Sequence, residues 1–459
     1  MNLYSALLRR TVFPLILKRD ERLSALRHWH FLERSQYWSR QELLDYQWMK
    51  LRKLLQYSYE NSRYYARLFR ERGLTPQSFK SFGDLALLPM LTRNDLFNHK
   101  DEIFSKKYDV AAVQEVVSGG TTGVQAILYR DPESFNIKMG LGWRHEGWMG
   151  RRPCDKMAFF WPVHADFYDP GTWKTKFKIR HLIREAYYYA GSAKKEVMQE
   201  FYENLMDFRA DYLKVFPNPL AGFTQYVLEH ALKAPRLRGI LSTGEVLSAG
   251  QRKIFEETYG CPVYDMYGSR ETGNTASECS KHEGLHIAME TSLVEFVNNG
   301  KAVDYGTEGE ILITDLTNYA FPMIRYQIGD YGIPLKSGCS CGRGLPLMSP
   351  AVGRIQDHFY SPDGTRHSGL MLAVHIVSDH HIIVGQIQVV QKTLTDFHVK
   401  LVRKPEPTQE VLNYIESQMR KIIGEKINIE IELVDEIPKE KSGKVRFVIC
   451  EVPEPGGIK

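Results

Sequence analysis

This chain of 459 residues has few cysteines and lacks long hydrophobic runs. No apolar run approaches the roughly 20 residues that a membrane-spanning helix needs, so the sequence predicts no transmembrane segment. The six cysteines are too few and too unevenly spaced for a disulfide framework in a chain of this length. We therefore expect a protein without a signal peptide that folds in the reducing cytoplasm.

A strong excess of charge of one sign is missing as well. The chain has 60 lysine and arginine residues against 55 aspartate and glutamate residues, which gives a net charge of +5. Its basic residues form no stripe interleaved with aromatics, so we expect no nucleic-acid partner. The apolar content of 43% and the charged content of 25% are typical of a globular protein, and the length favours two domains of unequal size.

The middle of the chain alternates short β-like runs with helical patterns, after a helical region at residues 40–104. Residues 211–216, 238–243 and 261–268 have the composition of buried strands, and residues 247–260 have the periodicity of a crossover helix. This order predicts a parallel sheet with helices on its faces, whose ligands bind at the carboxyl ends of the strands.

Two later regions depart from this pattern. Residues 291–300 and 309–316 form alternating strands, which predict an appended antiparallel sheet or barrel. From about residue 380, strands, one helix and a polar tail predict a small C-terminal α+β domain joined by a hinge near Asp357. The expected fold is α/β: a large N-terminal domain with parallel sheets flanked by helices plus an antiparallel barrel-like part, and a small hinged C-terminal α+β domain. The expected boundaries are 1–40 for a basic amphipathic extension, 41–356 for the main domain and 357–459 for the mobile C-terminal domain.

The N-terminal extension has two open interpretations. Residues 1–31 mix leucines with arginines and lysines, a pattern typical of an amphipathic segment on an anionic membrane surface, here the inner membrane surface. The same pattern fits a helix docked on its own domain with its charges outward. Pro14 interrupts the periodicity and Asp20 and Glu21 dilute the charge, which favours the docked helix.

A loop of hydroxyls and glycines lies at residues 118–123, in the stretch VVSGGTTGVQAILYRD. Its three glycines permit positive φ angles and close approach of a ligand, so successive N–H groups could converge on an anion. A flexible turn is the alternative. The loop has no Lys-Ser/Thr pair after its last glycine, so it is not a Walker loop.

Further motifs follow in order. Tyr267 and Glu271 come just after a predicted strand, where an aromatic ring could stack on a base and a carboxylate could hold Mg²⁺. Asp330 lies on a glycine turn, where one carboxylate can accept from both hydroxyls of a ribose. Lys444 lies in a glycine-containing loop near the end of the chain, as expected for a mobile cation.

In order and spacing these motifs resemble the adenylate-forming superfamily of acyl- and aryl-CoA synthetases, from about residue 40 to the end. More narrowly, the chain is similar to the phenylacetate-CoA ligase branch with its CapK-type relatives. The resemblance implies that residues 41–356 form an adenylation domain. It also implies that ATP activates a carboxylic acid, aryl or medium acyl, to an acyl adenylate with release of pyrophosphate. The acyl group then passes to a thiol, most often that of coenzyme A.

The resemblance also implies roles for single residues. Lys444 bridges the carboxylate and the α-phosphate, and Glu271 coordinates Mg²⁺. Both act where a carboxylate attacks a phosphate, a step that demands neutralised charge. The glycine and hydroxyl loop embraces the β- and γ-phosphates, Tyr267 stacks on adenine and Asp330 binds the ribose. The loop comprises Ser118, Gly119, Gly120, Thr121, Thr122 and Gly123, and the other nucleotide-binding residues are Ser242, Gly244, Glu245, Gly268 and, at the hinge with Asp357, Arg354.

Two positions depart from the family pattern. Many relatives follow the last loop glycine with a lysine, whereas this chain has Val124 and Gln125. One phosphate contact is therefore missing or supplied elsewhere. Gln327 stands where an arginine is common, while Arg325 and Asp330 are retained.

The substrate pocket and the metal ligands are open questions in the sequence. His164, Phe216 and Asn218 lie in aromatic stretches that could line the acid pocket or belong to the core. Four soft ligands could form a structural zinc site, or the thiols could be reduced and unliganded. These four are Cys279, His286, Cys339 and Cys341.

Two classes of function fit these patterns. The first is a ligase that uses ATP, Mg²⁺ and a thiol acceptor. The second is a nucleotide-binding protein of the same fold with lost or altered adenylation, or a ligase that transfers the acyl group to an amine or a carrier protein. The missing lysine favours the second class, whereas Glu271, Asp330 and Lys444 together favour the first.

Overall fold

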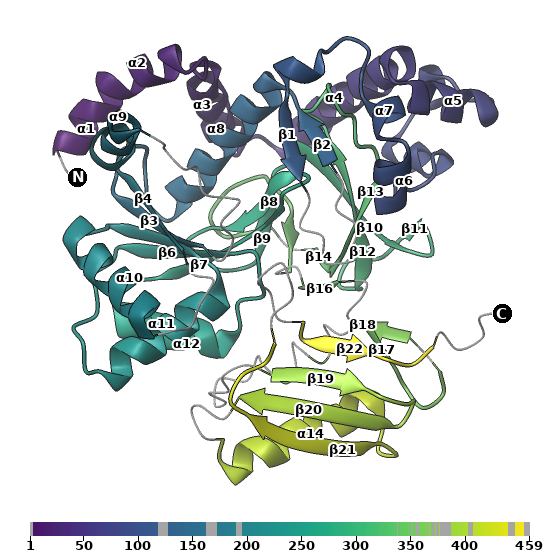
Figure 1. The fold of residues 1–459 in the computed structure, drawn as a ribbon. Helices are drawn as coiled ribbons and strands as arrows, with labels where there is room; N and C mark the ends of the chain where they lie inside the picture. Colours follow the sequence, from purple (N-terminus) through teal and green to yellow (C-terminus); the bar gives the residue numbers. More distant parts are fainter. Residues whose placement is uncertain are drawn as a thin grey trace.

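The computed structural model describes residues 3–453, except for residues 118–126, 162–171, 190–194, 337, 350–351, 355–357, 365, 369–371, 373–375, 377–386, 403–406 and 439–445. Helices from the first part of the chain lie at one end of the molecule, and the small C-terminal sheet lies at the opposite end (Figure 1). Among the described residues, no helix is both long enough and apolar enough to cross a bilayer.

The first helices pack on the main body of the protein. On α8 (Pro132–Trp148), Asn136 donates to Ser24 Oγ of α3 at 2.8 Å. The two helices come so close at Gly140 that a Cβ atom there would lie 2.8 Å from the backbone nitrogen of Trp29. Pro14 lies in the first turn of α2, where its missing N–H costs no hydrogen bond, so it does not break the helix. The helices are α1 (Leu3–Arg10), α2 (Val12–Arg19) and α3 (Ser24–Ser35).

Residues 40–104 are mainly helical, as their periodicity predicts. A capping box starts the long helix α4: the Ser39 side chain accepts from the backbone of Glu42, and the Glu42 carboxylate accepts from the backbone of Ser39. These elements are α4 (Arg40–Asn61), α5 (Arg63–Glu71), η1 (Pro76–Ser78), η2 (Phe82–Leu87), α6 (Arg93–Asn98) and α7 (Lys100–Ile103), and η3 (Val110–Ala112) follows. The ribbon of β1 (Gln114–Val117) and β2 (Ile127–Arg130) comes next.

A nine-stranded sheet forms the centre, in the order β14-β15-β9-β8-β7-β6-β5-β3-β4. Its strands β4, β3, β5, β6 and β7 are parallel, and the helix between β6 and β7 is the predicted crossover, so the prediction of a parallel sheet is confirmed. The strands are β3 (Met157–Trp161), β4 (Glu185–Tyr189), β5 (Tyr212–Val215), β6 (Gly239–Thr243), β7 (Val263–Ser269), β8 (Gly273–Glu278), β9 (Leu285–Ile287), β14 (Pro334–Leu335) and β15 (Leu347–Met348).

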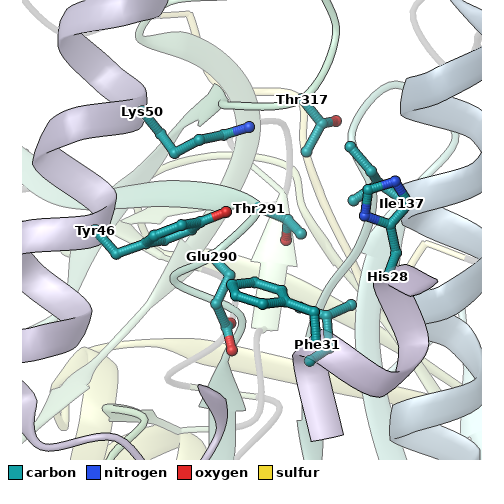
Figure 2. A pocket seen from close by; sticks show the side chains of 9 residues that line it. His28, Phe31, Tyr46, Lys50, Ile137, Glu290, Thr291 and Thr317 are labelled. Carbon is teal, nitrogen blue, oxygen red and sulfur yellow. The ribbon is translucent and has the colours of Figure 1, made fainter. Parts of the chain in front are cut away.

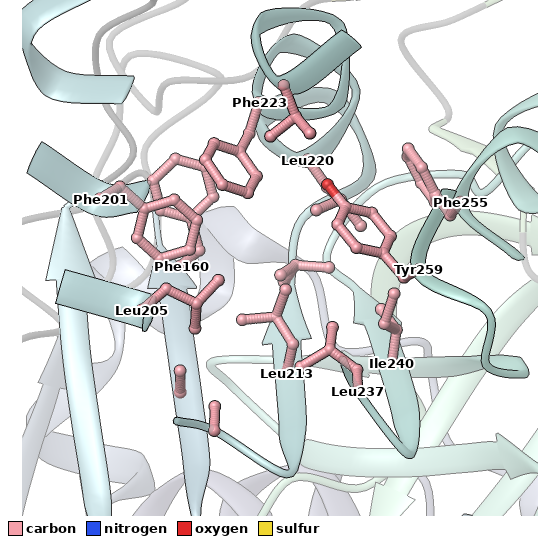
Figure 3. Packing of buried hydrophobic residues seen from close by; sticks show 14 of the residues in the cluster. Phe160, Phe201, Leu205, Leu213, Leu220, Phe223, Leu237, Ile240, Phe255 and Tyr259 are labelled. Carbon is pink, nitrogen blue, oxygen red and sulfur yellow. The ribbon is translucent and has the colours of Figure 1, made fainter. Parts of the chain in front are cut away.

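Helices cover one face of this sheet and bury its aromatic core. Figure 3 shows Phe160, Phe201 and Phe223 side by side in this core, and the rings of Phe160 and Phe201 stack with centroids 3.9 Å apart. Because such burial fixes the strand ends, it also fixes the loops that follow them. The helices and turns of this part are α9 (Trp173–Phe177), η5 (Lys178–Ile183), α10 (Lys195–Phe208), α11 (Pro217–Glu229) and α12 (Ala249–Tyr259).

The predicted antiparallel part is a five-stranded sheet in the order β11-β10-β12-β13-β16. Leu91 connects it to the helical region, because its N–H donates to the Arg325 carbonyl at 3.0 Å and its carbonyl accepts from Gln327 at 2.9 Å. The chain segment before α6 is therefore held beside β13. The strands are β10 (Ser292–Asn298), β11 (Lys301–Ala302), β12 (Gly309–Asp315), β13 (Tyr326–Gly332) and β16 (Val352–Arg354).

The described C-terminal part contains a four-stranded sheet, in the order β21-β20-β19-β22, a two-stranded sheet of β17 and β18, and the helix α14. It has a hydrophobic core of its own, in which Val389, Val399 and Ile415 are fully buried. The elements are β17 (His358–Tyr360), β18 (Arg366–Ser368), β19 (Ile387–Gln391), β20 (Asp396–Val402), α14 (Gln409–Ile423), β21 (Asn428–Val434) and β22 (Val448–Cys450).

Candidate functional site

Two predicted nucleotide-binding residues meet at the boundary between the two large sheets. Tyr267, near the carboxyl end of β7, donates its hydroxyl to Asp330 Oδ2 of β13 at 2.8 Å. Asp330 lies opposite Arg354 in the pairing of β13 with β16. The hydrogen bond orients the Asp330 carboxylate, which is the group predicted to receive the ribose hydroxyls.

Glu271 lies in the turn between β7 and β8 and is held by an arginine from a distant part of the chain. Its side chain is only 8% exposed, and Arg93 Nη2 at the start of α6 lies 3.0 Å from Glu271 Oε1. Burial and the nearby Glu271 carboxylate raise the pKa of Tyr326, which is adjacent to this ion pair. The predicted Mg²⁺ ligand therefore lies in a partly desolvated, charged environment.

A second arginine holds the backbone of the same turn. Arg130 at the end of β2 donates to the carbonyl of Arg270 at 2.8 Å and, more weakly, to that of Glu271 at 3.5 Å. Burial lowers the pKa of the Arg130 guanidinium, although the nearby Asp315 carboxylate opposes the shift. Since β2 directly follows residues 118–126 in the sequence, Arg130 connects the strand after the predicted phosphate loop to the Glu271 turn.

The stretch STGE (residues 242–245) at the carboxyl end of β6 lies against the residues predicted for the acid pocket. Gly244 has φ +80°, and a Cβ atom there would lie 2.3 Å from a ring carbon of Phe216, so only glycine fits. The Asn218 N–H donates to Glu245 at 3.2 Å, and the Phe216 ring meets the Trp161 ring edge-on with centroids 4.6 Å apart. These groups thus lie in contact with one another, and the Phe216 ring is buried among them.

The structure also describes the surroundings of two further residues that were predicted to bind the nucleotide. The Ser242 hydroxyl is fully buried and has no hydrogen-bond partner among the described residues. At Gly268, a Cβ atom would lie 2.6 Å from the carbonyl oxygen of Gly273 on β8, where the register of the two strands shifts. Strand pairing alone therefore accounts for the glycine at position 268.

The four predicted metal ligands are brought together at the other end of β8. Their ligand atoms all lie within 4.8 Å of one another. Cys279 Sγ lies 3.5 Å from Cys339 Sγ, and Cys341 Sγ lies 3.4 Å from His286 Nε2. A tetrahedral site with metal–ligand bonds of about 2.0–2.3 Å has neighbouring ligand atoms about 3.4–3.8 Å apart. The donor set and its spacing therefore fit a closed zinc site.

The surroundings of His286 prepare its ring for a metal. Burial, with nearby Arg343 and Arg144, lowers its pKa to about 4, so the ring is neutral at neutral pH. Its Nδ1 lies 3.4 Å from the Leu345 carbonyl. Donation from Nδ1 to this carbonyl leaves the Nε2 lone pair facing Cys341, the orientation that a metal ligand needs.

Comparisons with known proteins agree with this geometry. Residues 359–451 match the CapK C-terminal domain family. The chain is 25% identical to the phenylacetate-coenzyme A ligase of Thermus thermophilus, over 89% of this chain and 97% of that protein. It is 21% identical to Protein CapK of Staphylococcus aureus, over 90% of each chain. This chain is a homologue of the phenylacetate-CoA ligases and of CapK.

The solved structures place this homologue in a known fold. The 2-hydroxyisobutyryl-CoA ligase in its postadenylation state, in complex with 2-HIB-AMP, matches with a TM-score of 0.70 at 19% identity and with 88% of both chains covered. The fold is that of the adenylate-forming CoA ligases, with parallel and antiparallel sheets and a C-terminal domain. The predicted fold class is thereby confirmed.

Several predicted site residues lie outside the described residues. These are the whole phosphate loop, His164, Asp357 and Lys444, and of Arg354 only the backbone is described. Their roles stay predictions from the sequence.

The sequence analysis missed Arg93 and Arg130. Arg93 is separated from Glu271 by 178 positions and Arg130 from Arg270 by 140. The stretch around Arg93 has the pattern of an ordinary capped helix start, with Thr92 and Asp95 forming the capping box. Nothing in the sequence around either arginine distinguishes it from a surface cation.

A small cavity between α3, α4 and α8 is not part of these clusters (Figure 2). His28 and Phe31 of α3 and Tyr46 and Lys50 of α4 line it, with Glu290 at one side. Its volume of about 50 Å³ has room for a few water molecules and not for an acyl substrate. No residue predicted for the site lines it, so we do not assign it to the substrate.

Proposed function

We propose that this protein is an AMP-forming acid–thiol ligase. It activates a carboxylic acid with ATP to an acyl adenylate, releases pyrophosphate and passes the acyl group to a thiol, with coenzyme A as the acceptor. Homology to phenylacetate-CoA ligases along nine-tenths of the chain supports the proposal, as does the fold shared with 2-hydroxyisobutyryl-CoA ligase, a protein whose structures include 2-HIB-AMP and CoA. The observation that carries it is the Tyr267–Asp330 pair beside the Glu271 turn.

The nucleotide lies across the ends of β6, β7 and β13 in this proposal. Asp330 accepts from the ribose hydroxyls, and the Tyr267 ring stacks on adenine. Their hydrogen bond of 2.8 Å holds the carboxylate in place before ATP arrives, which lowers the entropy lost on binding. The backbone of the STGE turn, with Ser242, Gly244 and Glu245, runs along the base.

The phosphates need a cation that their own loop does not provide. Residues 118–129 contain no lysine and no arginine, and Arg130 already donates to backbone carbonyls. Arg93, beside Glu271 at 3.0 Å, supplies this charge in our proposal. Glu271 would hold Mg²⁺, which neutralises phosphate charge when bound. Arg130 fixes the backbone that presents the Glu271 carboxylate.

The acid binds beside the STGE turn. Phe216 and Asn218 form its wall, and His164 belongs to the same pocket. The edge-on contact of Phe216 with Trp161 makes this wall aromatic, which suits an aryl or medium acyl group.

Residues 357–459 act as the mobile domain in this proposal. Residues 118–123, with Thr121 and Thr122, surround the phosphates, and Lys444 arrives with the C-terminal domain for the chemical step only. Arg354 and Asp357 mark the hinge. A cation that bridges the attacking carboxylate and the α-phosphate lowers the barrier between two anions.

We further propose that the cysteine and histidine cluster holds one structural zinc ion. The four ligands join the end of β8 to the loop that precedes β15, and none of them is needed for contact with substrate. A closed four-ligand site of this kind contributes folding free energy directly. The thiols stay reduced in the cytoplasm, where we place the reaction, with residues 1–40 at the inner surface of the membrane.

A second function is favoured by one observation, the Val124–Gln125 pair in place of a lysine. In this alternative the protein binds nucleotide with lost or altered adenylation, or transfers the acyl group to an amine or a carrier protein. Exchange of labelled pyrophosphate into ATP, screened over aryl, fatty and sugar-derived acids, separates these functions because it needs no acceptor. Exchange with an aryl or medium acyl acid is expected. Measurable ATP binding with no exchange for any acid would instead establish the nucleotide-binding function.

Substitution of Lys444, compared with a control substitution in the same loop, tests the chemical step. Lys444→Ala should lower the exchange rate by about 100-fold or more while the affinity for ATP stays within a few-fold. Lys441→Ala, three residues earlier in the same loop, is the control and should keep the exchange rate. An unchanged rate in Lys444→Ala would remove this residue from the mechanism. Formation of the CoA thioester, measured by mass, then tests the acceptor separately.

A further inference from the structure

The first two helices are fixed on the protein by one buried face. Leu8 of α1 and Phe13 and Leu17 of α2 are buried in a core with Trp29 and Trp143. Polar contacts hold the same helices: Arg9 Nε donates to the Pro153 carbonyl at 2.7 Å. Residues 3–19 therefore keep one orientation on the main body.

Their opposite face exposes leucines. Leu3 is 83% exposed and Leu15 is 67% exposed, and Leu7 is exposed as well. The sequence left open a docked helix with its charges outward, and the structure instead shows docked helices with both charges and leucines outward. Apolar side chains gathered on a fixed outer face mark an interaction surface.

The surface continues onto α9, which the sequence did not indicate. Trp173 is 73% exposed, and Phe177 at the other end of α9 is exposed too. The π-helix η5, which directly continues α9, contacts α2. Lys178 Nζ lies 3.0 Å from Asp20 Oδ2. Leu3, Trp173 and Leu15 are the three most exposed large apolar side chains among the described residues.

Positive charge surrounds these apolar side chains. Glu21 is exposed on the same helical region, while Asp20 is engaged by Lys178. The cations exceed these acids, so the surface complements anionic lipid headgroups. An exposed tryptophan flanked by lysines is typical of a side chain that sits at the level of the headgroups. The exposed cations are Arg10, Lys18, Arg19, Lys174 and Lys176.

We propose that α1, α2 and α9 form a docking surface for an anionic membrane, with Trp173, Leu3 and Leu15 inserted at the headgroup level. This inference rests on the proposed membrane contact of residues 1–40, extends it to α9, and is independent of the ligase activity. The surface lies at the end of the molecule opposite to the C-terminal sheet (Figure 1), so docking leaves the C-terminal part away from the membrane.

Sedimentation of the full chain with vesicles tests the surface. We expect binding to vesicles of phosphatidylglycerol and phosphatidylcholine in equal parts, and at least about tenfold weaker binding to phosphatidylcholine alone. Raised salt should weaken binding to the mixed vesicles. Equal binding to both kinds of vesicle, or binding to neither, would overturn the proposal.

Variants locate the contact. Trp173→Ala and the pair Lys174→Glu/Lys176→Glu should each weaken vesicle binding by about tenfold. Tyr305→Ala, which removes an exposed aromatic ring elsewhere, should leave it unchanged. Pyrophosphate exchange and Tm, measured on every variant, show whether the fold and the proposed activity are intact. Unchanged vesicle binding in the α9 variants would contradict the assignment. A change in the oligomeric state of these variants, measured by light scattering, with vesicle binding unchanged would contradict it as well.

Discussion

The two ends of the β7–β8 hairpin carry two clusters of opposite character. At the turn, Glu271 is paired with Arg93 and Tyr267 is hydrogen-bonded to Asp330, so the groups that we propose as ligand-binding already have protein partners. At the other end, Cys279 faces the remaining three ligands across distances that one metal ion would close.

In our proposal the two clusters are used in different ways. A nucleotide at the turn would replace existing contacts, so its binding would be a balance of similar interactions and could be reversed in each cycle. The thiols and the imidazole would gain their best partner only with a zinc ion, so metal binding would be part of folding. The proposal thus gives the same hairpin an exchangeable site at one end and a permanent site at the other.

Removal of a thiol from the permanent site should have the largest effect. Cys279→Ser should lower the metal content from about one zinc per chain to near zero and cost more than about 4 kcal/mol of folding free energy. The expected drop in Tm is roughly 4 °C or more. Metal analysis and calorimetry measure both effects.

Cys450→Ser is the matched control, because Cys450 is partly buried and lies outside the cluster. It should keep the metal content. A metal-free wild-type preparation with full stability and activity would leave the four residues as an ordinary thiol and imidazole cluster.

At the proposed nucleotide site, Glu271→Gln should act much more on rate than on folding. Loss of the carboxylate that would hold Mg²⁺ should lower pyrophosphate exchange by about 100-fold, while Tm changes little. Glu295→Gln is the control, since Glu295 is also paired with an arginine, Arg325, at 3.2 Å. Equal losses of exchange in both variants would show a general effect of broken ion pairs.

Asp330→Asn should act on substrate binding. A ribose contact is present before and during the reaction, so KM for ATP should rise about tenfold while kcat stays nearly constant. Tyr267→Phe, which removes the hydroxyl that orients Asp330, should have a smaller effect of the same kind. Steady-state kinetics of exchange distinguishes them, and a fall in kcat alone would give Asp330 another role.

A double-mutant cycle on Arg93 and Glu271 tests whether the ligand-free pair is coupled. Denaturant unfolding of Arg93→Gln, Glu271→Gln and the double variant should give a coupling free energy of about 0.5–3 kcal/mol. Mg²⁺–ATP should reduce this coupling, because in our proposal it takes over contacts of both side chains. Additive losses without ligand would mean that the contact of 3.0 Å contributes nothing to stability.

The hairpin between the two clusters should respond to pH with the smallest effect. Burial, with the Glu278 carboxylate nearby, raises the pKa of Asp265 on β7 from 3.8 to about 7. The folded protein therefore keeps this proton while the unfolded chain loses it, so stability falls as pH rises from about 4 to 7 and levels off above.

The substitution Asp265→Asn should remove the loss of stability that accompanies the rise in pH. Its Tm relative to the parent should be a few degrees higher at pH 8 than at pH 5, with the exposed Asp304→Asn as control. A difference that does not depend on pH would mean that Asp265 ionises alike in both states.

Much of the fold follows from local patterns. The strands ending near Val215, Thr243 and Ser269 were predicted because their apolar runs, turn signals and intervening helix are all local features. Tyr267, Glu271 and Asp330 were predicted as site residues because strand-end motifs stand at recognisable positions. The contact between Tyr267 and Asp330 was not predictable from either motif alone, since the pairing of β7 and β13 residues depends on how two sheets pack.

The surroundings of Arg93 and of the exposed leucines in residues 3–19 could not be predicted from local patterns. Arg93 sits in an ordinary capped helix start, and the hydrogen bonds of Leu91 with Arg325 and Gln327 hold this segment beside β13, near Glu271. The periodicity of residues 3–19 shows that the helices have two faces, but not which partner each face meets. Gly244 was predicted as a nucleotide-binding residue, and the Phe216 ring beside it gives the reason that no Cβ fits.

The type and order of the elements and the chemistry of the available side chains follow from the local sequence, because hydrogen bonding along the backbone and burial along one strand or helix depend on a few neighbouring residues. Which of these side chains become partners depends on the packing of the whole chain. Glu271 and Arg93 are 178 positions apart, and Cys279 and Cys339 are 60 apart. Contacts of this range depend on the packing of whole sheets and helices, a property of the complete chain that no short stretch carries.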